Sequence, residues 1–257
     1  MITVISPAKS LNYDDKSAIA YSSEARMLDE SEKLMKVLKK KSPKKLMDLQ
    51  GISENLGQLN FERNQVWQTP LIAEQSKQAL LAFTGDVYVG FNAETLNESQ
   101  VDYTQSHLRI LSGLYGVLRP FDMMMPYRLE MGTSLKTTRG KNLYEFWKDR
   151  ITDLINEDLK EVNTNLLLNL ASNEYFKSIN TKKLNAEVIS PSFLDWSNGK
   201  YKVLSFFAKK ARGMMARFVI DHQISKPDDL RGFDVEGYLF NEELSKENKP
   251  VFTRKQS

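Results

Sequence analysis

The chain has 257 residues, of which 41% are hydrophobic and 27% are charged, a composition typical of a globular protein with a sizeable core. It contains no cysteine and two histidines, so the sequence excludes disulfides, thiolate catalysis and histidine-rich metal sites. The 36 Lys and Arg residues nearly balance the 33 Asp and Glu residues, and the net charge of +3 gives only weak support for polyanion binding.

The first residues of the chain predict a short buried strand over 2–6 that Pro7 ends. No basic leader precedes this strand, and the apolar run is too short for a secretory signal. No apolar run approaches the roughly 18 residues that a membrane span needs. We therefore expect a cytoplasmic protein with no membrane partner.

The spacing of apolar residues and the positions of proline and serine predict the next elements. Apolar residues at helical spacing predict a helix within 24–41, and Pro43 suits the first turn of a second helix. The nearly continuous apolar run 166–170 predicts a central strand. Ser172 is suited to cap a short helix that runs to Phe176.

The carboxyl-terminal part contains the clearest hairpin signal, Asn198-Gly199, because Asn-Gly readily adopts the positive φ angles of a type I′ turn. Strands are expected over 188–196 and 200–207, followed by a helix over 208–222. Residues 237–240 and 251–253 are predicted to form a closing strand pair.

The order of these elements predicts the fold class. Helices and strands alternate irregularly, and no repeat, low-complexity tract or Gly/Ser linker marks a boundary. We expect a mixed α/β (α+β) fold in one compact domain over 1–257, with a mixed sheet flanked by helices.

A run of residues without acidic side chains, 196–220, stands out in this nearly neutral chain. Its cations are Lys200, Lys202, Lys209, Lys210, Arg212 and Arg217. Clustered like charges favour an anionic partner, whereas ordinary exposed helices interleave both signs. The alternative is a solvated face whose long side chains cover apolar surface. Gly213 is expected to let another backbone approach the helix closely.

A second segment without acidic residues, 33–45, precedes a pattern that resembles a helix-hairpin-helix over about 43–60. Gly51 would turn the chain, and Ser53 would begin a second helix whose free N–H groups favour a phosphate. Gln50 stands where that motif commonly has proline, and Ser53 where it commonly has a second glycine. The alternative is an ordinary pair of helices with Gly51 as a helix stop.

The segment 108–132 is rich in Gly and Pro, which predicts a turning backbone. It carries Arg109, Arg119 and Arg128. Arginines fixed on such loops can bind phosphate in a bidentate geometry. The alternative is that two of them pair with Asp122 and Glu130 and hold the loop together.

Lys9 follows the first strand, a position where α/β folds often bind ligands, although it also suits a solvent-exposed lysine. Three carboxylates offer an alternative chemistry, because Asp86, Glu130 and Glu174 could hold Mg²⁺ beside a phosphate. Under that alternative, the protein is a metal-dependent enzyme acting on nucleic acid or a phosphorylated substrate.

Several sequence blocks together resemble the YaaA-type peroxide-stress resistance family. The blocks are Ser-Pro-Ala-Lys at 6–9, Gly-Asp-Val-Tyr at 85–88, the segment 108–132, Asn-Leu-Tyr-Glu-Phe-Trp at 142–147, Asn-Leu-Ala-Ser at 169–172, Glu-Tyr-Phe-Lys at 174–177 and Ala-Lys-Lys-Ala-Arg-Gly at 208–213. The resemblance implies a single-domain fold with a basic cleft and a helix-hairpin-helix. It also implies a cytoplasmic protein that binds duplex DNA, protects it from hydrogen peroxide and is linked to a lower level of reactive iron.

We therefore expect binding to double-stranded or structured DNA through the phosphate backbone, with no cofactor, no metal, no established catalysis and a monomeric state. The expected DNA-binding residues are Lys9, Lys40, Lys44, Lys45, Gly51, Ser53, Arg109, Arg119, Arg128, Lys177, Lys209, Lys210, Arg212 and Arg217. Direct iron binding is a further alternative, although no Glu-x-x-His pair typical of di-iron helices is present.

Overall fold

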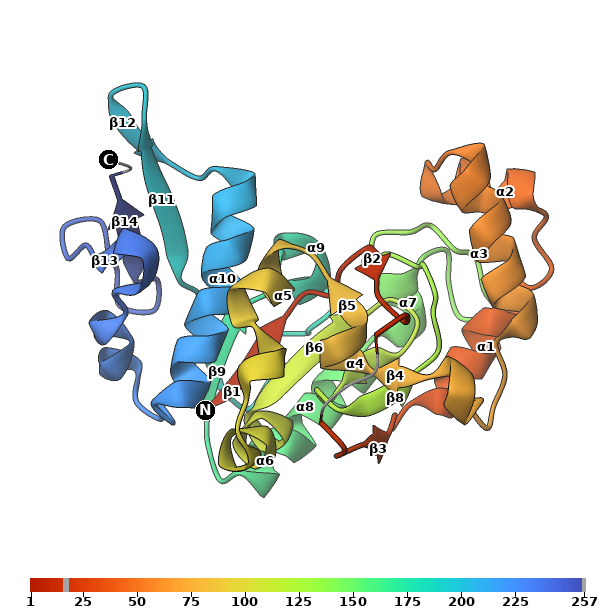
Figure 1. Ribbon diagram of the computed structural model, residues 1–257, viewed down its shortest axis with the longest axis horizontal. Helices are drawn as coiled ribbons and strands as arrows, with labels where there is room; N and C mark the ends of the chain where they lie inside the picture. The colour runs from red at the N-terminus through yellow and green to blue at the C-terminus, as the bar shows by residue number, and fades with distance from the viewer. Residues whose placement is uncertain (16–18, 256–257) are drawn as a thin grey trace.

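The computed structural model describes residues 1–15 and 19–255, and its centre is a five-stranded sheet (Figure 1). The strand order is β10 (Glu187–Ile189), β9 (Leu166–Leu170), β1 (Ile2–Ile5), β6 (Leu108–Ser112) and β7 (Gly116–Leu118). The first four of these strands run parallel, whereas β7 returns antiparallel to β6. The strands predicted near the N-terminus and at 166–170 are both confirmed.

Strand β1 lies in the middle of this sheet. All four of its residues are buried, as expected where both faces of a parallel sheet are covered. The chain passes from β1 to β6 on one side and later to β9 on the other, so its direction across the sheet reverses at β1. Open α/β sheets bind ligands beyond the carboxyl ends of the strands at such a reversal.

A second sheet, at the carboxyl-terminal end of the chain, confirms two predicted pairings. Its order is β12 (Lys200–Lys202), β11 (Ser192–Ser197), β14 (Val251–Arg254) and β13 (Leu239–Phe240). Asn198 and Gly199 have φ angles of 52° and 79° in the turn between β11 and β12, which confirms the predicted hairpin. The antiparallel pairing of β13 with β14 confirms the closing pair.

The structure corrects two predicted boundaries beside that hairpin. The single strand expected over 188–196 is divided, because Pro191 lacks the N–H that a continuous ladder requires; β10 joins the central sheet and β11 the second sheet. The strand expected over 200–207 ends at Lys202, where pairing with β11 ends. Helix α10 (Ser205–Asp221) therefore begins three residues earlier than expected.

Shorter strands and helices complete the fold around the central sheet. Two small sheets pair β2 (Ser10–Leu11) with β5 (Phe83–Thr84), and β3 (Ser23–Glu24) and β4 (Lys77–Gln78) with β8 (Asp122–Met124). The helices are α4 (Ala79–Ala82), α5 (Asp86–Phe91), α6 (Glu98–His107), α7 (Leu143–Trp147), α8 (Arg150–Glu161) and α9 (Asn173–Phe176), with 3₁₀ turns at Ala73–Gln75, Ala93–Thr95, Pro227–Gly232 and Val235–Gly237. Ser172 is the N-cap residue of α9, as predicted, but its side chain makes no capping hydrogen bond.

Three helices form a lobe at the end of the molecule opposite the second sheet (Figure 1). They are α1 (Leu28–Leu38), α2 (Pro43–Gln50) and α3 (Glu54–Val66). Helix α1 is shorter than the predicted 24–41 because the preceding β3 is held by pairing with β8. Pro43 occupies the first turn of α2, as predicted, and Gly51 ends this helix in the left-handed conformation with φ 61°.

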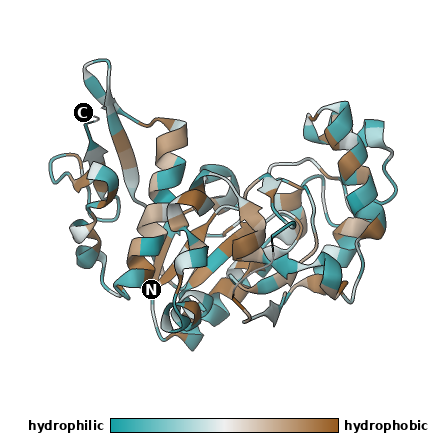
Figure 2. Cartoon of the chain, viewed as in Figure 1, coloured by the Kyte–Doolittle hydropathy of each residue, from teal (hydrophilic) through white to brown (hydrophobic). Residues whose placement is uncertain are grey.

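Hydrophobic residues concentrate in the central strands and on the helices packed against them, whereas α2 and α3 are mainly hydrophilic (Figure 2). The expected mixed α/β fold is confirmed. Within residues 1–15 and 19–255, no helix has the length and apolarity needed to cross a membrane.

Candidate functional site

A cavity of about 410 Å³ lies where the strands β1 and β9 end. Its walls come from residues 6–10 after β1, from 84–88 at the start of α5, from 170–175 after β9, and from Glu130 and α10. The structure therefore brings three predicted cations from distant segments into one cavity: Lys9, Lys209 and Arg212.

Hydrogen bonds hold the strand ends that form the floor of this cavity. The Ser6 hydroxyl donates to the Ser172 hydroxyl at 3.3 Å and accepts from the Ser172 backbone N–H at 2.8 Å. The Tyr88 hydroxyl donates to the Ser6 carbonyl at 3.1 Å. These contacts tie β1, β9 and α5 together at the floor of the cavity.

The wall from α10 is placed by an unusually close packing of α10 against α5. A Cβ atom on Gly213 would lie 1.8 Å from the Val87 carbonyl oxygen, and one on Gly90 would lie 2.2 Å from the Lys210 carbonyl oxygen. The close approach predicted at Gly213 is confirmed. It places Arg212 in the cavity wall together with the first turn of α5.

The charged groups of the cavity are unevenly paired. Glu130 Oε1 forms ion pairs with Arg128 at 3.0 Å and with Lys9 at 3.5 Å. The Glu174 carboxylate accepts from the Gly132 N–H at 2.9 Å. Arg212 forms no ion pair or hydrogen bond with any residue that the structure describes, and burial lowers the pKa of its guanidinium.

The three carboxylates considered as Mg²⁺ ligands, Asp86, Glu130 and Glu174, all line this cavity. However, the described part of the chain contains no group of three or more His, Asp or Glu side chains arranged to hold a metal ion. The geometry thus gives the metal-dependent alternative no support of its own.

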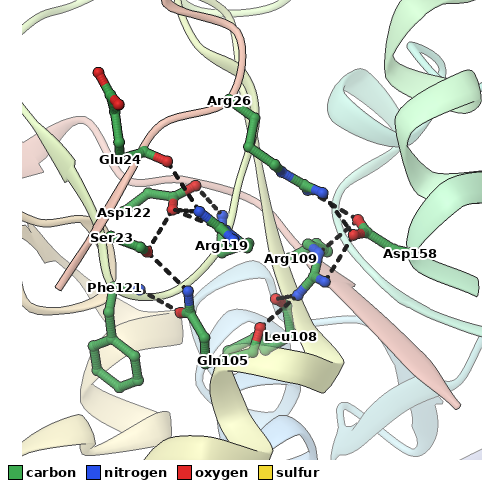
Figure 3. Close-up of polar contacts among 10 residues, drawn as sticks. All are labelled: Ser23, Glu24, Arg26, Gln105, Leu108, Arg109, Arg119, Phe121, Asp122 and Asp158. Carbon is green, nitrogen blue, oxygen red and sulfur yellow. Dashed lines mark hydrogen bonds and ion pairs between the residues drawn. The ribbon is translucent and has the colours of Figure 1, made fainter. Parts of the chain in front are cut away.

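Arg109 lies in the core, which corrects its expected place at a DNA surface. It is 2% exposed and donates to both carboxylate oxygens of Asp158, at 2.6 and 2.9 Å (Figure 3). Its remaining donor binds the Gln105 and Leu108 carbonyls at 2.8 and 2.7 Å. A phosphate cannot reach these groups, so Arg109 is not part of the candidate interface.

The two arginines that follow in the chain form the ion pairs considered as alternatives. Arg119 donates through Nε to Asp122 at 3.0 Å and through Nη2 to the Glu24 carbonyl at 3.0 Å (Figure 3). Arg128 pairs with Glu130. Both guanidinium groups therefore hold the 108–132 segment in place.

Two cationic side chains of the 196–220 run also bind other groups of the protein. Arg217 donates to the Asn92 carbonyl at 2.9 Å and the Thr95 hydroxyl at 2.6 Å, which caps the carboxyl end of α5. Lys210 forms an ion pair with Glu236. Lys177 is exposed, with its ammonium 5.2 Å from the centre of the Tyr144 ring.

The remaining predicted residues are all exposed and lie in the hairpin of α2 and α3 or just before it: Lys40, in the turn after α1, and Lys44, Lys45, Gly51 and Ser53. None of these lysines forms an ion pair with a residue in the described part of the chain. Ser53 precedes α3 without a capping side-chain bond. The hairpin lies at the opposite end of the molecule from α10 (Figure 1).

The sequence analysis did not predict how two residues, Gln50 and Gly57, position the hairpin. The Gln50 side-chain amide donates to the Arg128 carbonyl at 2.8 Å, which joins the turn to the 108–132 segment. A Cβ on Gly57 would lie 2.5 Å from Met47 Cγ, so this glycine lets α2 and α3 cross closely. A glycine inside a predicted helix is the signal that could have identified the crossing.

Comparison with known proteins places this chain in a family. The family model described as Peroxide stress protein YaaA matches residues 1–244. UPF0246 proteins from Neisseria gonorrhoeae (strain NCCP11945) and Teredinibacter turnerae are each 51% identical, over 254 and 256 residues. These alignments cover 99% of this chain and 98% of the first relative, and 100% of both chains for the second. The chain therefore belongs to the peroxide stress protein YaaA family, as its sequence motifs predict.

Proposed function

We propose that this peroxide-stress protein binds double-stranded or structured DNA through the phosphate backbone. The observation that carries the proposal is the exposed hairpin of α2 and α3 with the turn before it, where Lys40, Lys44 and Lys45 have no acidic partner among the described residues. Gly51 turns the chain tightly, and no Ser53 side-chain bond caps the start of α3, so a phosphate could bind its first N–H groups. Lys9 and Lys209, which line the central cavity, and the exposed Lys177 would form a second set of phosphate contacts, separate from the hairpin.

DNA binding would protect DNA from peroxide because the damaging radicals form at the DNA phosphates. Ferrous iron bound at DNA phosphates reduces peroxide to hydroxyl radicals that attack the nearest strand. Lysines that occupy those phosphates release the bound cations. We propose that the protein limits reactive iron at DNA in this way, without a dedicated iron site.

The hairpin is tested by replacing Lys40, Lys44 and Lys45 together with Glu. If about five phosphates are neutralised, the wild-type protein should show a log K against log salt slope of about −4.5, and the variant a slope about 2.7 less steep. Affinity for a labelled duplex near 0.1 M salt should fall at least about tenfold, as measured by fluorescence anisotropy.

The matched control replaces Lys160, Lys182 and Lys249, which are exposed and lie outside the hairpin, and changes net charge equally. Its affinity should stay within about threefold of wild type. Equal losses in the two variants, or a wild-type slope near zero, would contradict the proposed hairpin interface.

The protective role predicts fewer strand breaks when DNA with bound protein is exposed to ferrous iron and peroxide. The hairpin variant should lose this protection in proportion to its lost DNA occupancy, while the control variant keeps it. Gel analysis of plasmid nicking at equal protein concentration measures the effect. Protection by the hairpin variant at concentrations where it leaves DNA unbound would show that protection does not depend on DNA binding.

A further inference from the structure

Arg212 differs from the other arginines near the cavity because it lacks a protein partner. It is partly buried in the cavity wall, yet no described residue pairs with it or accepts a hydrogen bond from it. Arg217, five positions later on α10, has an Asp221 carboxylate at 2.6 Å and caps α5. Removing a guanidinium from water without a counter-charge costs stability. An anion in the cavity would offset that cost.

In the same cavity, one carboxylate oxygen of Glu130 lacks a hydrogen-bond donor. Its Oε1 is occupied by Arg128 and Lys9, whereas its Oε2 is buried and accepts no hydrogen bond. A buried acceptor without a donor is also unfavourable. A ligand that satisfies both groups needs an anionic part for Arg212 and a hydroxyl or amino donor for Glu130.

We propose that this cavity binds the phosphate and sugar–base portion of one nucleotide. A second α10 cation, Lys209, lines the cavity with Arg212, so a doubly charged phosphate suits this wall better than a single carboxylate. The 410 Å³ volume lies within the usual range for small-molecule sites, and Tyr88 and Tyr175 provide aromatic wall. The nucleotide is either free or displaced from a DNA strand; in the second form the inference rests on the proposed DNA binding.

The proposal predicts that Arg212, unlike Arg217, does not stabilise the fold. Because Arg212 has no partner to lose, Arg212→Met should leave the Tm unchanged or raised. Arg217→Met, which breaks several bonds, should lower it by about 2–4 °C or more. A fall of more than about 4 °C in Arg212→Met would overturn the premise that its charge is uncompensated.

Calorimetry tests whether the cavity binds a free nucleotide. Deoxynucleoside monophosphates should bind the wild-type protein at least about tenfold more tightly than the matching nucleosides or inorganic phosphate. Arg212→Met should weaken that binding by about tenfold, whereas Arg231→Met, at an exposed arginine outside the cavity, should leave it within about twofold.

Fluorescence anisotropy with labelled DNA tests whether the cavity binds a nucleotide displaced from a strand. A duplex with one unpaired nucleotide should bind more tightly than the fully paired duplex, and Arg212→Met should remove this difference. The hairpin variant should weaken both duplexes equally, so failure of the cavity and failure of the DNA interface give different results. If free nucleotides bind no better than nucleosides and the two duplexes bind equally, the nucleotide site is overturned.

Discussion

Asp158→Asn is expected to lower the free energy of unfolding by about 3–5 kcal/mol, because it leaves a buried arginine without its counter-charge. The Asp158 side chain is fully buried and receives two bonds from Arg109 and a pair from Arg26 at 2.7 and 3.0 Å (Figure 3). Asn offers one acceptor oxygen and no charge. Urea denaturation of the two proteins at pH 7 measures the loss.

The same carboxylate predicts a dependence of stability on pH. Burial by itself would raise the pKa of Asp158, but hydrogen bonds from Arg109 and Arg26 outweigh it and lower this pKa below 3.8. The depressed pKa gives stability that is fully present above pH 3.8 and is lost as the pH falls through the folded-state value. Asp158→Asn should therefore lose less stability than wild type on acidification.

Asp228→Asn is the control for this prediction. Asp228 pairs with Arg231 at 3.1 Å, and the two side chains are 84% and 57% exposed. Such exposed pairs contribute about 1 kcal/mol at most. If Asp158→Asn cost no more than Asp228→Asn, the buried pair would not be needed to hold α8 against β6.

Gly213→Ala is expected to lower the free energy of unfolding by about 3 kcal/mol, since the new methyl group would overlap backbone atoms of α5. The nearest atom is the Val87 carbonyl oxygen at 1.8 Å, and a hydrogen-bonded backbone cannot move aside as a flexible side chain can. Separating α10 from α5 would also displace the Arg212 wall of the cavity. Thermal and urea unfolding measure the first effect.

Gly232→Ala provides the matched control. A Cβ there would meet only Phe218, at 3.8 Å, an ordinary contact distance. This substitution should change stability by less than about 1 kcal/mol. Similar stabilities for the two alanine variants would mean that the helices separate without cost and that the close crossing does not position the cavity.

Sequence patterns predicted the parts of this structure that depend on neighbours in the chain. Apolar runs identified β1 and β9, and Pro43 identified the start of α2. Asn198-Gly199 identified the tight turn, because the φ angles required there suit few other residues. The division at Pro191 was the main local feature missed, although the missing N–H of proline was visible in the sequence.

The site depends on contacts between residues far apart in the chain, which local sequence patterns do not reveal. Arg109 and Arg212 look alike in the sequence, since each follows an apolar residue and has no acidic residue beside it. Folding buries Arg109 against Asp158, 49 residues away, and leaves Arg212 in a cavity without a partner. The sequence motifs by themselves identified the family, and composition and apolar spacing indicated the mixed α/β class and the cationic segments. Only the tertiary structure decided which cations are neutralised, because charge pairing acts through space between residues distant in the chain.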